Sequence, residues 1–141
     1  MMGTKEVTDG EFKGWRYWDN DSFEKRVGPF FFRKEGDSYV GAFRAEKRHM
    51  NGNGSMHGGC IMSFADFGLF IIAHDEVAET PGVTVTMNSE FMGGALPGEL
   101  MEVRGDVLRA GGSLVFVRGV ITAEGRPCLN FSGTIKKLKP R

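Results

Sequence analysis

Residues 51–75 read N-G-N-G-S-M-H-G-G-C-I-M-S-F-A-D-F-G-L-F-I-I-A-H-D. A loop of glycine and asparagine leads to a His-Gly-Gly, and the glycine pair opens a run that is apolar on almost every side of a helix. A helix without a polar stripe is a buried helix. Its length of about 15 to 17 residues is too short to span a bilayer, which needs about 20. The stretch therefore predicts one long central helix from about His57 to His74 or Glu76.

A single carboxylate, Asp66, lies in the middle of this helix. Burying an unpaired carboxylate costs several kcal/mol, so a residue of this kind at such a position usually has a function. Two interpretations follow. Asp66 is either a catalytic group or a structural carboxylate held by the backbone or by Thr84.

The bulk composition excludes several classes of function. With 141 residues the chain is expected to form a single domain, residues 1–141. Lys plus Arg and Asp plus Glu are 18 each, which argues against a nucleic-acid-binding face. Cys60 and Cys128 fall in apolar segments and predict buried free thiols in a reducing compartment. The N-terminus has no apolar signal-peptide core, so we expect a cytoplasmic protein without a membrane segment.

The segments before the central helix are shorter and more mixed. Residues 1–28 form an N-terminal extension in which Trp15, Trp18 and Phe23 share a helical face, which predicts a short amphipathic helix. Residues 30–33 and 39–44 flank a turn and predict a hairpin.

After the central helix the apolar period changes to two. Val83, Val85 and Met87 share one face of a strand that runs to Phe91, and Thr84 lies on the other face. Further strands are predicted at about 100–109, 113–122 and 127–138. Because the turns between them are short, sequential strands should be antiparallel neighbours. We expect an α+β fold in which a curved antiparallel sheet of about five to six strands wraps the long buried helix. One small sheet cannot cover every side of that helix, so a second subunit is expected.

The combination of motifs resembles a known family. The loop and His-Gly-Gly at 51–59, Asp66 nine positions after His57, and the strand G-V-T-V-T-M-N-S-E-F-M at 82–92 resemble the hotdog-fold acyl-CoA thioesterases, and most closely the phenylacetate-degradation (PaaI-like) group. The resemblance spans residues 30–138. It implies a hotdog fold and a hydrolase of acyl-CoA thioesters, of the EC 3.1.2 type. Coenzyme A would be part of the substrate rather than a cofactor. It also implies a homodimer or homotetramer with sites shared between subunits.

The same resemblance implies roles for individual residues. Asp66 would be the general base, and Thr84 would hold the attacking water. Asn51 would orient water or the carbonyl, His57 would position the thioester, and the Gly58 N–H would donate to the oxyanion. The implied substrate-binding residues are Gly59, Phe91, Met92, Gly93, Arg109, Gly111 and Gly112. The aromatic segment before Val27 has no counterpart in the family, and we hypothesise that it caps the acyl pocket and sets substrate choice.

Helix geometry supports a shared site independently of the resemblance. Nine residues place Asp66 about 180° around the helix from His57 and about 13 Å along its axis. One chain's His57 and Asp66 therefore cannot easily meet on a single thioester.

Several alternatives stay open at this point. His57 is equally suited to capping the helix, Asn51 to ordinary turn chemistry in N-G-N-G, and Thr84 to a structural role in its strand. No metal site is expected, since His49, His57 and Cys60 have no fourth ligand at suitable spacing.

Two other functions fit the same fold. A non-catalytic acyl- or CoA-binding hotdog module would have no need of Asp66. A hotdog dehydratase would pair a histidine with a carboxylate in one site, which suits the spacing of His57 and Asp66 less well than hydrolysis does. The aromatic content favours an aryl or medium-chain acyl group.

Overall fold

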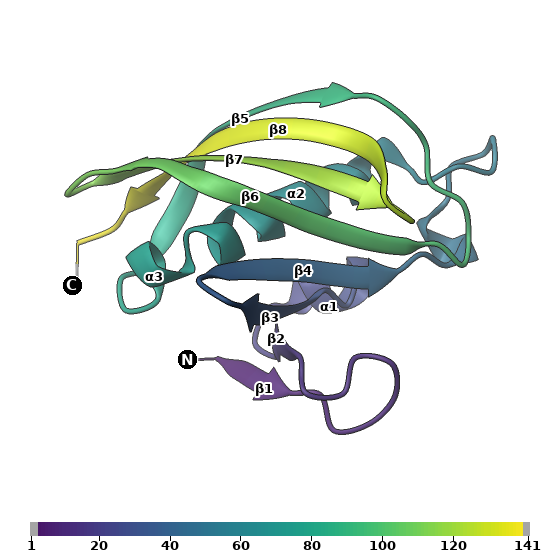
Figure 1. Ribbon diagram of the computed structural model, residues 1–141, viewed down its shortest axis with the longest axis horizontal. Helices are drawn as coiled ribbons and strands as arrows, with labels where there is room; N and C mark the ends of the chain where they lie inside the picture. The colour runs from purple at the N-terminus through teal and green to yellow at the C-terminus, as the bar shows by residue number, and fades with distance from the viewer. Residues whose placement is uncertain (1–2, 140–141) are drawn as a thin grey trace.

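The computed structural model describes residues 3–139, and in it a curved antiparallel sheet wraps one long helix, α2 (Gly58–Ile72) (Figure 1). The sheet has eight strands in the order β1-β2-β3-β4-β6-β7-β8-β5, and every neighbouring pair is antiparallel. The strands are β1 (Thr4–Glu6), β2 (Arg16–Trp18), β3 (Phe31–Glu35), β4 (Ser38–Arg44), β5 (Gly82–Phe91), β6 (Leu100–Ala110), β7 (Leu114–Ala123) and β8 (Arg126–Lys137). The predicted arrangement of helix and sheet is confirmed.

The prediction of five to six strands is too low, because the N-terminal extension adds β1 and β2 to the sheet. Trp15 and Trp18 are spaced as on a helix, but Arg16–Trp18 pairs with Thr4–Glu6, and Trp18 stacks on Phe32 with ring centroids 4.8 Å apart. Three-residue strands are too short to show a period of two in sequence. The extension does contain a helix, α1 (Ser22–Val27), which begins later than predicted.

Helix α2 is buried by close packing against the inner face of the sheet. A Cβ atom at Gly68 would lie 2.7 Å from Val103 on β6, and one at Gly41 of β4 would lie 2.8 Å from the ring of Phe67. These two glycines therefore let the helix backbone and the sheet approach more closely than side chains would allow. Two short helices flank α2 in the chain: η1 (Lys47–His49) precedes it and α3 (His74–Val77) follows it.

One stripe of α2 is not covered by the sheet. Met62, Ser63, Asp66 and Phe70 are only half-buried, whereas the remaining residues between Cys60 and Ile71 are buried. Their spacing of three to four residues places them on one face of the helix. This face carries the carboxylate that the sequence singled out.

The short links predicted that the chain would run through consecutive hairpins after α2. This prediction is wrong for β5. β5 pairs with β8 and not with β6, and residues 92–99 carry the chain across the sheet to β6, which pairs with β4. β5 is thereby the last strand of the sheet, and one of its edges has no partner strand among residues 3–139. Figure 1 shows β5 at the rim of the curved sheet.

A β-bulge changes which residues of β5 face inward. Thr84 pairs with Ile135 and Thr86 with Thr134, so Val85 is an extra residue on β5. Thr84 and Met87 are half-buried, while Val83 and Val85 are exposed. The strict alternation predicted from Val83 to Phe91 is therefore wrong before the bulge, because one inserted residue moves the neighbouring side chains to opposite faces.

Both cysteines are buried and free, as predicted. Burial raises the pKa of the Cys60 thiol to about 11, and it also raises the pKa of Cys128. Among residues 3–139, no helix has the length and apolar character needed to cross a bilayer.

Candidate functional site

The site is built around a hydrogen bond between helix α2 and strand β5. The Thr84 hydroxyl donates to Oδ1 of Asp66 at 2.6 Å, and both side chains are half-buried. The bulge at Val85 points Thr84 toward the helix, so the contact depends on that irregularity. A carboxylate with one oxygen fixed by a hydroxyl and a cavity beside it has the arrangement of a general base.

Asp66 lies on the wall of an open cavity of about 460 Å³ between α2, α3 and the N-terminal extension. A second cavity of about 370 Å³ adjoins the other side of the same carboxylate, where Met62 and Ser63 line it. Both cavities are also lined by Asp21 and Glu24, from the start of α1. Asp66 and two acidic side chains of the extension thus line both cavities.

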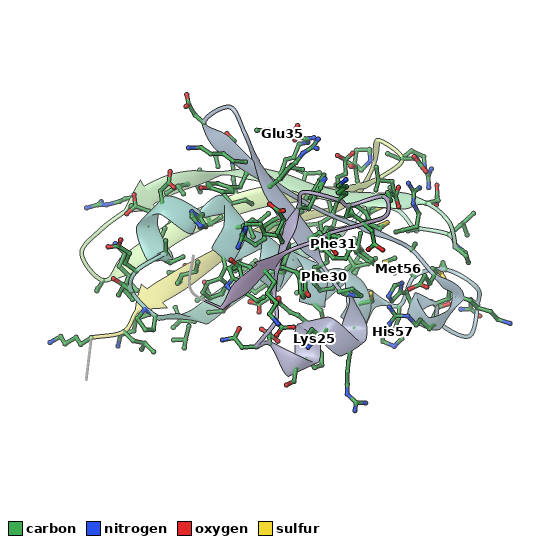
Figure 2. The ribbon with its side chains drawn as sticks, turned by 90° about the horizontal axis from the view of Figure 1, so that it is seen from below. Lys25, Phe30, Phe31, Glu35, Met56 and His57 are labelled. Atoms are coloured by element: carbon green, nitrogen blue, oxygen red, sulfur yellow. The ribbon has the colours of Figure 1, made fainter. Side chains whose placement is uncertain are left out.

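The N-terminus of α2 is a separate group of candidate residues. His57 is the N-cap, and its Nδ1 accepts from the Gly59 N–H at 2.8 Å. Because Nδ1 is the acceptor, the neutral ring carries its proton on Nε2, which is exposed and available as a donor. Figure 2 shows His57 and Met56 where the preceding loop joins α2. One ring nitrogen of His57, Nδ1, therefore caps the helix, and the other, Nε2, is free for a substrate.

The first residue of α2 offers a backbone donor. None of residues 3–139 supplies an acceptor for the Gly58 N–H, and the ring of Phe91 lies over this position, 3.4 Å from where a Cβ would be. A helix N-terminus carries partial positive charge, so this N–H is suited to an oxyanion. A Cβ at Gly59 would lie 3.0 Å from Nδ1 of His57, so a side chain there would crowd the cap.

Asn51 is used within its own loop. Its Oδ1 accepts from the N–H groups of Asn53 at 2.8 Å and Ser55 at 3.3 Å, and its Nδ2 donates to the Ser55 hydroxyl at 3.4 Å. These bonds are the turn chemistry that the N-G-N-G sequence predicts. The remaining N–H of the amide is the atom left to act on a substrate.

The structure does not bring all the predicted residues together within one chain. Neither cavity beside Asp66 is lined by His57 or Gly58, in agreement with the helix geometry. The substrate-binding residues also separate into two groups. Arg109, Gly111 and Gly112 lie in or next to the turn between β6 and β7, at the same end of the sheet as the start of β5. At that end Lys137 of β8 pairs with Gly82, and the Lys137 N–H donates to the Ser113 carbonyl.

The other group lies at the far end of the same strand. Phe91 pairs with Leu129, and Met92 and Gly93 both donate their N–H groups to the Cys128 carbonyl. At about 3.3 Å per residue, the two ends of β5 are about 30 Å apart. One chain alone therefore cannot place both groups on one small molecule.

Comparison with known proteins identifies the family. The profile of the Thioesterase superfamily matches residues 53–129, a range that contains His57, Asp66, Thr84 and Phe91. The chain belongs to the thioesterase superfamily. A curated relative, the "Putative esterase PA0474" of Pseudomonas aeruginosa, is 32% identical over 109 residues, which cover 76% of this chain and 81% of that protein. At the general level the chain is a thioester hydrolase.

Solved structures show that this thioesterase has the hotdog fold. The Escherichia coli PaaI protein from the phenylacetic acid degradation operon aligns with a TM-score of 0.75 and 18% identity, over 86% of this chain and 88% of that one. Zebrafish thioesterase superfamily member 2 aligns with a TM-score of 0.74 and 25% identity, over 86% and 89%. A "Hypothetical Thioesterase Protein" of Streptococcus pneumoniae, solved with coenzyme A, aligns with a TM-score of 0.70 and 18% identity, over 79% of this chain and 88% of that one. The predicted resemblance to PaaI-like hotdog proteins is confirmed.

Sequence reasoning missed the part of the cavity wall that comes from the N-terminal extension of this thioesterase. Trp18, Asp21 and Glu24 line the cavity beside Asp66, as does His74 from α3. The available signal was D-S-F-E at 21–24, a capping sequence: Oδ1 of Asp21 accepts from the Glu24 N–H at 2.9 Å and starts α1. That signal fixes the helix but says nothing about which helix it packs against.

The carboxyl group of Glu24 in this wall has a strongly perturbed pKa. Burial raises its pKa to about 8, and the nearby carboxylates of Asp21 and Asp66 add to the rise. The hypothesis that the extension caps the acyl pocket stays a prediction; Trp18, Asp21 and Glu24 of the extension line the same cavity as Asp66.

Proposed function

We propose that this thioesterase hydrolyses aryl- or medium-chain acyl-CoA by water attack assisted by Asp66. The observation that carries the proposal is the Thr84–Asp66 hydrogen bond on the wall of a cavity large enough for an acyl group. The cavity wall includes the aromatic rings of Trp18 and Phe70, which suit an aryl or medium-chain group. The Streptococcus pneumoniae protein solved with coenzyme A supports CoA as the carrier.

In the proposed reaction, Asp66 takes a proton from a water molecule whose oxygen attacks the thioester carbon. The carbonyl oxygen becomes an oxyanion, which the Gly58 N–H and the N-terminus of α2 stabilise, with Nε2 of His57 as a further donor. The C–S bond then breaks, the thiolate leaves with the proton returned from Asp66, and the products are a carboxylic acid and free CoA. General-base assistance contributes roughly 100- to 10,000-fold, and one oxyanion donor about 100- to 1,000-fold. No cofactor takes part.

The proposed site combines two subunits. If β5 pairs antiparallel with β5 of a second copy, the start of each strand lies opposite the end of the other. Thr84 and the Asp66 side chain that it contacts then approach Phe91 of the partner subunit. Within each chain the ring of Phe91 lies over Gly58, so the pairing also brings Gly58 of the partner subunit toward Asp66. The same pairing brings the Arg109 turn toward the other subunit's Phe91–Gly93 segment. The two ends of β5 that one chain holds apart would thus form one site.

The free edge of β5 supports this pairing. Val83 is 42% exposed and Val85 49% exposed on a strand with an unpaired edge within residues 3–139. An exposed apolar edge strand is a template for pairing with another chain. The assembly proposed is a homodimer or homotetramer. The two buried free thiols of each chain favour a reducing compartment such as the cytoplasm.

The proposal is tested by free-thiol release from a panel of aryl-, short- and long-chain acyl-CoAs, comparing wild type with Asp66→Asn. Wild type should hydrolyse at least one thioester, and the isosteric amide should be about 100- to 10,000-fold slower. Circular dichroism and the melting temperature should show that the variant is folded.

Other outcomes identify the alternatives. Binding of acyl-CoA without thiol release by wild type would favour the non-catalytic module. Loss of water from an added 3-hydroxyacyl-CoA, giving an enoyl-CoA with the thioester intact, would favour a dehydratase. Equal rates for wild type and Asp66→Asn would remove Asp66 from the mechanism.

A further inference from the structure

Helix α1 presents one carboxyl group to the cavity of the candidate base. Among its residues, Ser22, Phe23, Lys25 and Arg26 are exposed, whereas Glu24 and Val27 are half-buried on the face that turns toward α2. Glu24 lines both cavities that Asp66 lines. The N-terminal extension therefore contributes a second carboxyl group to the surroundings of the base.

The charged groups around Glu24 do not neutralise it. Asp21 at the cap of α1, Asp66 on α2 and His74 on α3 line the same cavity. The Asp21 carboxylate already caps the helix, and His74 contacts Asp75 through Nδ1 at 3.4 Å. Within residues 3–139 the Glu24 carboxyl makes neither an ion pair with Lys or Arg nor a side-chain hydrogen bond. An ionised Glu24 would thus face two like charges without a counter-ion.

We propose that Glu24 is a positioning residue of the hydrolytic site, which closes the cavity wall beside Asp66 as an uncharged carboxylic acid. This inference rests on the proposed function. Negative charge passes from Asp66 to the thioester oxygen and then to sulfur as the reaction proceeds. When Glu24 is neutral, the N-terminus of α2 stabilises the negative charge on the thioester oxygen without opposition from the cavity wall. An ionised Glu24 would repel both Asp66 and the developing oxyanion.

The consequence is a dependence of the rate on pH that one side chain controls. Glu24 keeps its proton at neutral pH, because burial and the two neighbouring carboxylates raise its pKa to about 8. As the pH rises through this range, Glu24 ionises and kcat should fall. Loss of this fall in a variant that cannot ionise at position 24 would assign it to the cavity wall and not to the base.

The experiment measures kcat from pH 6 to 10 for wild type and Glu24→Gln by the loss of thioester absorbance, with the background hydrolysis subtracted at each pH. Gln has the shape of the protonated acid and cannot ionise. We expect Glu24→Gln to keep the wild-type kcat at pH 7 within about threefold and to lose the fall near pH 8. Glu6→Gln, an exposed acid on β1, should keep the wild-type profile.

A second variant separates the electrostatic role from a structural one. Asp21→Asn keeps an N-cap side chain, since Asn caps helices as well as Asp does. It removes one of the two like charges, so the fall in kcat should move to lower pH. Loss of helix packing would expose Glu24 and lower its pKa as well, so the shift is assigned to the removed charge only when Asp21→Asn keeps the wild-type melting temperature.

The outcomes distinguish this inference from the proposed function. A wild type that hydrolyses no thioester overturns both. An active wild type whose fall near pH 8 is absent, or is retained in Glu24→Gln, overturns the role of Glu24 alone. Titration of the carboxyl carbon of Glu24 by NMR gives an independent readout, and a pKa near the ordinary value of 4.5 would contradict the inference.

Discussion

The Thr84 hydroxyl holds Oδ1 of Asp66 at 2.6 Å across the gap between strand β5 and helix α2, and it does so because the bulge at Val85 turns Thr84 inward. The strand therefore positions the candidate base on the helix. A hydrogen bond to a charged group contributes about 1.5 to 3 kcal/mol. The orientation of Asp66 should depend on this bond, and so should the rate.

Replacing Thr84 by Val removes the donor and keeps the shape of the side chain. We expect kcat for thioester hydrolysis to fall about 10- to 100-fold, which is the bond energy converted at 1.36 kcal/mol per factor of ten. Thr84→Ser keeps the hydroxyl and should stay within about threefold of wild type. Since Val favours strands, the fold should persist. A Val variant as active as the Ser variant would show that Thr84 does not orient the base.

His57 has two separable roles, and the choice of substitution distinguishes them. Its Nδ1 caps α2, while its Nε2–H is free for the substrate. Asn also caps helices, so His57→Asn should keep the melting temperature and lose activity. His57→Ala should lose activity and about 1 kcal/mol of stability as well. Thermal unfolding and kcat measured on both variants check this. Equal activity of His57→Asn and wild type would reduce His57 to a cap.

Most of the core of this fold could be predicted from sequence because its signals are local. The helix from His57 to His74 or Glu76 is observed as α2 and α3, since a run that is apolar all round has no other stable placement. The alternating segments at 100–109, 113–122 and 127–138 are observed as β6, β7 and β8 within one residue at each end. The Asp66–Thr84 contact was likewise one of the interpretations that the sequence allowed.

The features that the sequence did not predict depend on contacts between distant parts of the chain. The pairing of β5 with β8 is set by the packing of the whole sheet, and no local turn specifies it. The bulge at Val85 adds one residue to a strand whose sequence alternates without interruption. Glu24 looks like an ordinary residue of a first helical turn until α1 packs on α2. Each of these determines part of the site, which is why the cavity wall was not predicted.

The raised pKa of Glu24 also affects stability, with a definite sign. The folded chain keeps the Glu24 proton up to about pH 8, whereas the unfolded chain releases it near the ordinary value of about 4.5. Unfolding between these pH values therefore releases a proton, so the free energy of unfolding falls as pH rises through this window. Glu24→Gln should remove that decline, and its melting temperature should exceed that of wild type most at pH 8 and above. A difference in melting temperature between Glu24→Gln and wild type that is the same at pH 5 and at pH 8.5 would contradict the assignment.

The acidic wall predicts discrimination between acyl groups. Asp21 and Asp66 line the cavity as carboxylates, and like charges about 4 Å apart repel by about 1 kcal/mol in water and about 4 kcal/mol near a protein surface. Glutaryl-CoA, whose acyl end is anionic, should have a kcat/KM at least about tenfold below that of neutral pentanoyl-CoA. Asp21→Asn should recover part of the difference. Equal kcat/KM values for the two substrates would place the acyl end outside this cavity.

A mixed-subunit experiment decides whether the site is shared. Asp66→Asn and His57→Ala each remove one half of the proposed site, and each homo-oligomer should be inactive. In a heterodimer of the two variants with shared sites, one site receives His57 from the first chain and Asp66 from the second, so it is fully wild type, while the other site carries both substitutions. Purified heterodimers, isolated with two different affinity tags, should then have about half the wild-type kcat per dimer. If each site lay within one chain, both sites of the heterodimer would carry one substitution, and the activity would stay at the level of the inactive parents.

Val85→Lys, which places a charge on the exposed edge of β5, should prevent recovery by blocking association, and light scattering should show its monomer.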